Sequence, residues 1–114
     1  MGLQATIRET GDVTILDLAG RATIGADIDL LAGKLGRLVE GGARKLLVNL
    51  AGVTQIDSSG ISTLVRTFVA LERSGGSLKL LSPVGRVRQV LSIARLLGAI
   101  PTYDDEAPAL ASFR

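Results

Sequence analysis

The stretch of sequence that decides the fold is residues 45–61, which read KLLVNLAGVTQIDSSGI. Its first part, Lys45–Leu50, is a short apolar run of the kind that forms a buried strand in a parallel sheet. Asp57 and Ser58 then supply the side-chain oxygens that commonly cap the start of a helix. The stretch therefore predicts a strand that ends at Leu50, a turn, and a helix that begins beside Asp57.

The helix after Asp57 has the clearest pattern in the chain. Its apolar residues recur every three or four positions, so they fall on one face. This face contains Ile61, Leu64, Val65, Phe68 and Leu71. Gly75 and Gly76 end the helix, and Leu78–Leu81 predicts the next strand.

A third helix is predicted to follow that strand at once. Ser82 has the character of an N-cap and Pro83 that of a first helical residue, while Gly98 marks the end. The charged side of this helix is expected to face solvent. It contains Arg86, Arg88 and Arg95.

The remaining elements follow from the same kinds of pattern. They are a hairpin of Thr6–Glu9 and Val13–Leu18, a connection from Gly20 to Gly25, a helix from Ala26 to Glu40, a short edge strand at Ile100–Tyr103, and a last helix over Ala107–Phe113 capped by Asp104 or Asp105. The hairpin requires antiparallel pairing, and the later strand–helix–strand units require parallel strands. We therefore predict one α/β domain over residues 1–114, with a mixed sheet of four to five strands packed by about four helices.

The composition excludes several kinds of chemistry. The 114 residues include no cysteine and no histidine, so disulfides, thiolate or imidazole metal ligands and an imidazole general base are absent. Aromatic residues make up 3%, too few for a platform on which nucleic acid bases stack. The 13 basic and 11 acidic residues are scattered rather than clustered. No cofactor, metal or direct nucleic acid partner is expected.

The sequence also predicts where the protein works. No apolar run is long enough to cross a bilayer, and the first residues lack the basic flank and apolar core of a secretory signal. We therefore expect a cytoplasmic domain without a membrane span.

The richest candidate for a functional site is the junction between Leu50 and Gly60. In open α/β sheets, ligands and partners meet the carboxyl ends of strands and the helix N-termini that follow them. Free N–H groups in the first helical turn would favour an anion, such as a phosphate on Ser58 or Ser59. Two other interpretations stay open: these residues are only helix caps, or Ser58 is a nucleophile activated by a lysine.

The junction also resembles a known family, the STAS domain, which is named for sulphate transporters and anti-sigma factor antagonists. The resemblance rests on residues 47–50, LVNL, and residues 56–61, IDSSGI. It extends to Val13–Gly20, to residues 75–78 (GGSL), and to the spaced apolar residues between Val84 and Gly98. The DSSG motif resembles most closely that of stand-alone antagonists, which have similar lengths.

The resemblance implies a binding module that is switched by phosphorylation and is not an enzyme. In the family, the serine after the motif aspartate is phosphorylated by a serine kinase that is itself the anti-sigma factor. This serine corresponds to Ser58. The unphosphorylated antagonist sequesters the kinase and frees the sigma factor, and a separate phosphatase resets the serine. The implied partner-binding residues are Asp57, Ser59, Gly60, Arg21, Thr23 and Gln55.

One departure from the family pattern concerns the connection after Gly20. Many antagonists carry an acidic residue there, whereas this chain has Arg21. We expect this loop to lie near Ser58, where Arg21 could pair with a phosphate. An alternative function stays open, because some STAS domains are structural subunits of phospholipid ABC transporters or of signalling scaffolds.

Overall fold

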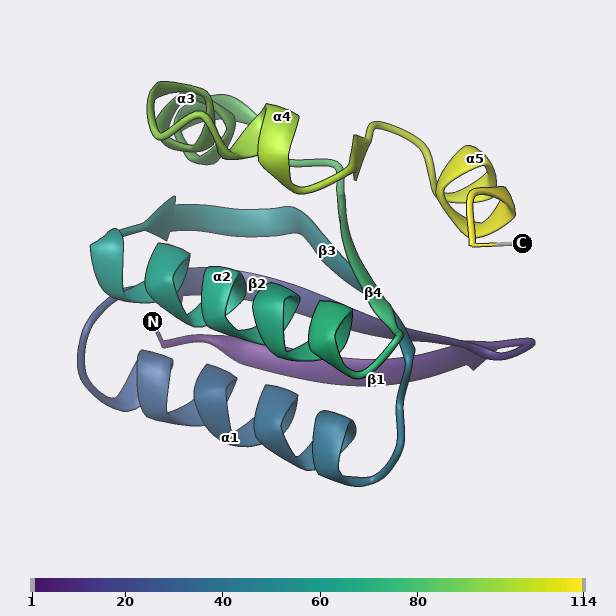
Figure 1. Cartoon of the computed structure of the whole chain (residues 1–114). Coiled ribbons are helices and arrows are strands. Elements are labelled where there is room, and N and C mark those ends of the chain that lie inside the picture. Colours follow the sequence, from purple (N-terminus) through teal and green to yellow (C-terminus); the bar gives the residue numbers. More distant parts are fainter. Residues whose placement is uncertain (1, 114) are drawn as a thin grey trace.

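The computed structural model describes residues 2–113, and these form one mixed sheet with helices on both faces (Figure 1). The strands are β1 (Gln4–Thr10), β2 (Val13–Ala22), β3 (Lys45–Ile56), β4 (Ser77–Leu81) and β5 (Thr102–Tyr103). They lie in the order β1-β2-β3-β4-β5. β1 pairs antiparallel with β2, and all the other neighbours are parallel. The predicted mixed sheet is confirmed.

Five helices occur within the described residues. They are α1 (Ala26–Glu40), α2 (Ser58–Arg73), α3 (Gly85–Ile93), α4 (Leu96–Ala99) and α5 (Glu106–Ala111). The long helices α1 and α2 lie side by side on one face of the sheet, and α5 lies on the other face (Figure 1). α3 packs against β3.

The side chains of the strands alternate between the two faces of the sheet and pack into two apolar clusters. Leu46, Val48 and Leu50 of β3 point into the larger cluster, which α1, α2 and α3 complete. Leu47 points the other way, into a smaller cluster under α5 that includes Phe113. Burial on both faces explains why residues 45–50 read as a continuous apolar run.

β3 is longer than predicted, because it continues through residues 51–56 instead of turning after Leu50. Its pairing with β2 shifts twice: between Asp17 and Ala19 of β2, and again between Gly20 and Arg21. At each shift β3 contributes one more residue than β2, which is a β-bulge and turns the following side chains over. The inward residues are accordingly Leu50, Val53 and Ile56, three positions apart.

The prediction for the third helix was wrong at both ends. Ser82 adopts a left-handed φ of 52°, and its N–H donates to the carbonyl of Tyr103 at 2.7 Å, so it extends the sheet pairing instead of capping a helix. The helix begins at Gly85 after the N-cap residue Val84. It breaks at Arg95, whose φ is 61°, and α4 follows as a separate turn. This break raises the number of helices from about four to five.

The arginines predicted for one solvated face of that helix are therefore separated. Arg88 lies on α3 and donates to a carboxylate oxygen of Asp104 at 3.0 Å, whereas Arg95 stands at the break and does not continue the helical face.

The other predicted elements are present, with small shifts in their bounds. The hairpin turns at Gly11 and Asp12, and α1 has the predicted bounds. β2 continues to Ala22, so the connection to α1 is shorter than predicted. α5 begins after the N-cap residue Asp105 and ends at Ala111, two residues before the predicted end.

Candidate functional site

Two connections meet at one end of the sheet. β2 and β3 are parallel, so the loop after Ala22 and the start of α2 after Ile56 emerge at the same edge. Figure 1 shows the end of β3, the first turn of α2 and the β2–α1 connection at the same end of the molecule. This is the junction that the sequence identified.

Asp57 holds these two connections together with both oxygens of its carboxylate. Oδ1 accepts hydrogen bonds from the backbone N–H groups of Ser59 at 3.0 Å and Gly60 at 3.1 Å, so Asp57 caps α2. Oδ2 accepts from the backbone N–H of Ile24 at 2.9 Å. The backbone N–H of Asp57 also donates to the carbonyl of Ala22 at 3.3 Å.

These contacts set the charge of the Asp57 carboxyl. The N–H of Ile24, followed by those of Gly60 and Ser59, stabilises the ionised form and lowers the pKa of Asp57, although partial burial acts in the opposite direction. Asp57 is therefore a carboxylate at neutral pH. The start of α2 carries a fixed negative charge of its own.

The same contacts correct one expectation about the first turn of α2. The N–H groups of Ser59 and Gly60 are bonded to the Asp57 side chain, and the N–H of Ile61 donates to the Asp57 carbonyl at 3.0 Å. These three groups are therefore already satisfied. They are therefore not free to receive an anion, contrary to the expectation from the sequence.

The two serines of the motif differ in exposure. Ser58 is the first residue of α2 and is exposed, whereas Ser59 is half-buried. The carbonyl of Ser59 accepts a hydrogen bond from the hydroxyl of Thr63 at 2.9 Å. Ser58 is therefore the more accessible hydroxyl for a modifying enzyme.

Gly60 lies inside the junction rather than on its surface. A Cβ atom at this position would lie 2.7 Å from the carbonyl oxygen of Ala22 and 2.7 Å from Cγ1 of Ile56. The absence of a side chain lets α2 start directly against the ends of β2 and β3. The structure thus places Gly60 in the support of the site.

The other predicted residues lie around this junction. Arg21 and Gln55 are both exposed and are register partners on β2 and β3. Thr23 is half-buried, and its hydroxyl donates to Asp27 of α1 at 3.3 Å. This hydrogen bond therefore directs the Thr23 hydroxyl towards α1.

Sequence reasoning missed Ile24. Its side chain is 78% exposed, the highest exposure among the large apolar residues described, and its N–H is held by Asp57 next to the serines. The available signal was an isoleucine directly before Gly25, in a connection where polar turn residues are usual.

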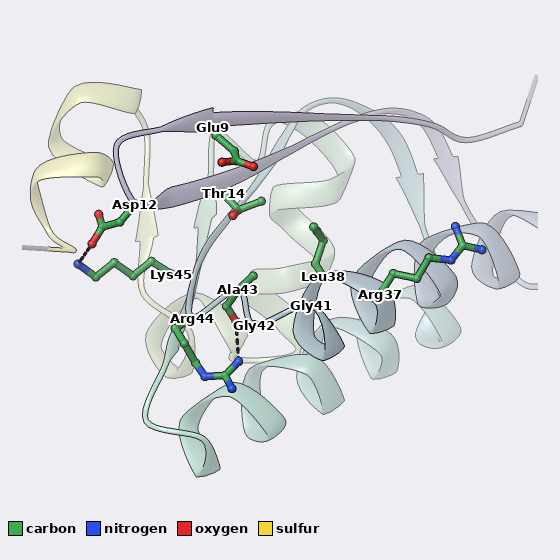
Figure 2. A pocket seen from close by; sticks show the side chains of 10 residues that line it. All are labelled: Glu9, Asp12, Thr14, Arg37, Leu38, Gly41, Gly42, Ala43, Arg44 and Lys45. Atoms are coloured by element: carbon green, nitrogen blue, oxygen red, sulfur yellow. Dashed lines mark hydrogen bonds and ion pairs between the residues drawn. The ribbon is translucent and has the colours of Figure 1, made fainter.

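Two hollows of the surface lie away from this junction. A hollow of about 460 Å³ lies at the opposite end of β3, between the hairpin and the end of α1 (Figure 2). Its cations do not converge on a common point: Lys45 is paired with Asp12, Arg44 donates to the carbonyl of Ala43 at 3.1 Å, and Arg37 points away. A second hollow of about 320 Å³ lies between α1 and α2. Neither hollow contains a predicted site residue.

Two further results apply to residues 2–113 alone. No helix in this range combines the length and the apolar character needed to span a membrane. No three acidic side chains in this range are grouped so that they could hold a metal ion.

The fold and the motif together identify the protein family. Residues 4–109 match the STAS domain, so the chain belongs to the STAS domain family. A relative from Thermotoga neapolitana, provisionally named an anti-sigma factor antagonist, is 36% identical over 69 residues. The match covers 60% of this chain and 61% of that relative, which is less than two thirds of the relative's length.

Solved structures show the same likeness over nearly the whole chain. A crystal structure from Thermotoga maritima, also provisionally described as an anti-sigma factor antagonist, is 26% identical and has a TM-score of 0.90. The similarity covers 96% of this chain and 94% of that one. The Bacillus cell fate determinant SpoIIAA in its phosphorylated form has a TM-score of 0.75 at 20% identity, over 97% of this chain and 100% of that one. At that identity, the likeness to SpoIIAA shows the fold alone.

Proposed function

We propose that this STAS domain is an anti-sigma factor antagonist, which acts in the cytoplasm by binding and not by catalysis. In the proposed mechanism it sequesters an anti-sigma factor while Ser58 is unmodified, and releases it when Ser58 is phosphorylated. The observation that carries the proposal is the exposed Ser58 on the first turn of α2, directly after the capping residue Asp57. The names of the Thermotoga proteins support the same assignment.

The proposed partners are two. The anti-sigma factor is a serine kinase that both binds and modifies the chain, and a phosphatase resets Ser58. The proposed contact surface consists of Asp57, Ser59, Gly60, Arg21, Thr23 and Gln55, to which we add Ile24 because of its exposure. Gly60 would support this surface from within, since it is buried and its N–H is bonded to Asp57.

The local charges favour a switch that acts at the interface. A phosphate on Ser58 adds about −1.5 to −2 charges at neutral pH. It would stand next to the carboxylate of Asp57, which already occupies two N–H groups of the first turn. The new charge would therefore be directed outward, towards solvent or towards a bound partner.

The size of this effect is sufficient to drive release. Two unit charges about 5 Å apart interact by roughly 3 kcal/mol at an effective dielectric constant of about 20. Moving a complex from almost fully bound to almost fully free requires about 5.5 kcal/mol. A doubly charged phosphate that meets a carboxylate or an apolar patch of the partner, and also clashes sterically, can reach this value. Arg21 is the cation that we propose as a stabilising neighbour of the phosphorylated form.

The experiment compares three forms of the chain with candidate serine kinases of the same organism. The unmodified chain, S58A and S59A are incubated with kinase and ATP, and the phosphate is located by tandem mass spectrometry. We expect phosphate on the unmodified chain and on S59A, but none on S58A. In a separate binding assay, S58A is expected to hold the kinase permanently, and a fourth form, S58D, to bind it more weakly.

Two outcomes would refute the proposal. One is a folded S58A protein that fails to bind a kinase that does bind the unmodified chain. The other is absence of phosphate with every kinase that is active on a control substrate. The second outcome would favour the role of a structural subunit, in which Asp57 and Ser58 serve as a helix cap.

A further inference from the structure

β1 is an edge strand with an open side. Within residues 2–113 it pairs only with β2, and it stands at one end of the strand order. Its seven residues pair in one unbroken register, from Gln4 with Ala19 to Thr10 with Val13. Natural proteins usually block such an edge with a proline, a bulge, a very short strand or charged side chains. β1 has no proline and no bulge, and of its two charged side chains Arg8 is already bonded to Asp17 and Glu106.

The hairpin determines which backbone groups face the open side. Gly11 and Asp12 form a two-residue turn, so Thr10 and Val13 exchange the hydrogen bonds that close it. The bonds to β2 then recur at every second residue, at Arg8 and Thr6. The N–H and C=O groups of the residues between them point away from β2. These residues are Ala5, Ile7 and Glu9.

An independent contact supports this alternation of backbone directions and limits the length of the open edge. Leu3 is two residues before Ala5, so its N–H also points away from β2, and it donates to a carboxylate oxygen of Asp27 on α1 at 3.0 Å. The start of α1 therefore closes the edge at Leu3. The open part runs from Ala5 to Glu9 and is centred on Ile7.

We propose that this open edge pairs with β1 of a second copy of the chain, antiparallel and around a twofold axis at Ile7. In this register Ile7 lies opposite the second copy's Ile7, and Ala5 lies opposite the second copy's Glu9. Every outward backbone group of the open part then finds a partner. If the pairing were shifted by two residues towards the N-terminus, Glu9 would lie opposite the second copy's Leu3. The N–H of Leu3 is already bonded to Asp27, so it could not pair there.

The side chains are compatible with the same register. Ile7 is 43% exposed on the face that carries α1 and α2, and it would meet another isoleucine. Arg8 would lie opposite Thr6, while its guanidinium stays bonded to the carboxylates of Asp17 and Glu106. A register two residues towards the C-terminus would instead place the two Arg8 side chains opposite each other, which is unfavourable. The strand is therefore complementary to itself when it is centred on Ile7, and this selects a second copy as its partner.

Single cysteines can test the register, because the chain contains none of its own. Directly opposed residues of this kind have Cα atoms about 5.5 Å apart, which a disulfide can span. We therefore expect I7C to form a covalent dimer under mild oxidation. E9C lies on the same face and edge, but its sulfur would be about 14 Å from its counterpart, so E9C alone should stay monomeric. An equimolar mixture of A5C and E9C should cross-link to a heterodimer.

Sedimentation equilibrium of the whole chain tests the association without cross-links. We expect dimers at high concentration, at least a tenfold weaker dimer for I7K, and an unchanged dimer for S58D, since Ser58 is not part of this edge. Circular dichroism would verify that each variant is folded. The proposal is overturned if the folded chain stays monomeric at several hundred micromolar, if I7K dimerises as well as the unmodified chain, or if I7C and E9C cross-link equally. None of these results depends on the switch proposed for Ser58.

Discussion

The carboxylate of Asp57 accepts a hydrogen bond from the backbone N–H of Ile24, 33 positions earlier in the chain, over a distance of 2.9 Å. The same carboxylate caps α2 through Ser59 and Gly60. One side chain therefore fixes both the start of α2 and the loop that follows β2. The position of the exposed Ile24 relative to Ser58 depends on this residue.

We expect D57A to lower the free energy of unfolding by about 1–2 kcal/mol, because removal of a capping side chain costs about this much. The amide of Ile24 should also exchange faster with deuterium, since it loses its acceptor. Urea unfolding and hydrogen exchange measure the two effects. A matched control is D105A, because Asp105 is the N-cap residue of α5 but makes no side-chain cap bond. Equal losses for D57A and D105A would contradict this assignment.

The lowered pKa of Asp57 predicts how stability depends on pH. Because the folded pKa lies below the unfolded value of about 3.9, the stabilisation is complete above that value and is lost as the pH falls through the folded pKa. The unfolding free energy, measured between pH 2 and 6, should therefore fall less steeply towards acid in D57N than in the unmodified chain. Some slope should remain, because Arg8 lowers the pKa of Asp17 in the same way. Parallel curves for the two proteins would refute the prediction.

We expect G60A to destabilise the fold by about 1–3 kcal/mol, since the added methyl group would meet the backbone of Ala22 at 2.7 Å. G36A is the matched control, because Gly36 lies within α1 and a Cβ there meets nothing within 4 Å. Alanine at that position should stabilise the helix by about 0.5–1 kcal/mol. Thermal unfolding of both variants gives the comparison. A neutral G60A would show that the junction can open without cost.

Arg8 joins the hairpin to α5 by donating to both Asp17 and Glu106. We expect R8A to cost about 1 kcal/mol, a modest value because the side chains are partly exposed. Amides of α5 should exchange faster in this variant. R88A removes an ion pair with the more exposed Asp104 and should cost less. If R8A and R88A leave α5 equally protected, the link between the hairpin and α5 is not a stabilising one.

Local patterns were sufficient for most of the fold. The bounds of α1 were predicted because its apolar spacing is regular and glycines stand on both sides. Asp57 was recognised as a cap because capping is a contact between near neighbours. Its bond to Ile24 could not be predicted in the same way, since it joins residues far apart in the sequence.

The predictions for the end of β3 and for the start of the third helix were wrong for a similar reason, because both depend on contacts between distant segments. The inward residues of the second half of β3 are three positions apart, which matches no regular strand, so that half was interpreted as a turn. Ser82 and Pro83 have the composition of a helix start. Ser82 instead bonds to Tyr103 and Asp104, on a segment that only the folded chain brings near.

The two bulges in β3 also determine which changes of length this chain can accept. Each bulge places two residues of β3 opposite one of β2, so Ile56 still lies opposite Ala22 and points inside. Deletion of the extra residue at either bulge would remove that bulge, while Ile56 would keep its place opposite Ala22 and stay inside. Deletion of two residues, one from each bulge, would give a regular strand, and Ser58 would keep its place because Ile56 would still lie opposite Ala22. The two bulges are therefore the places where this strand can lose single residues while the start of α2 stays where it is.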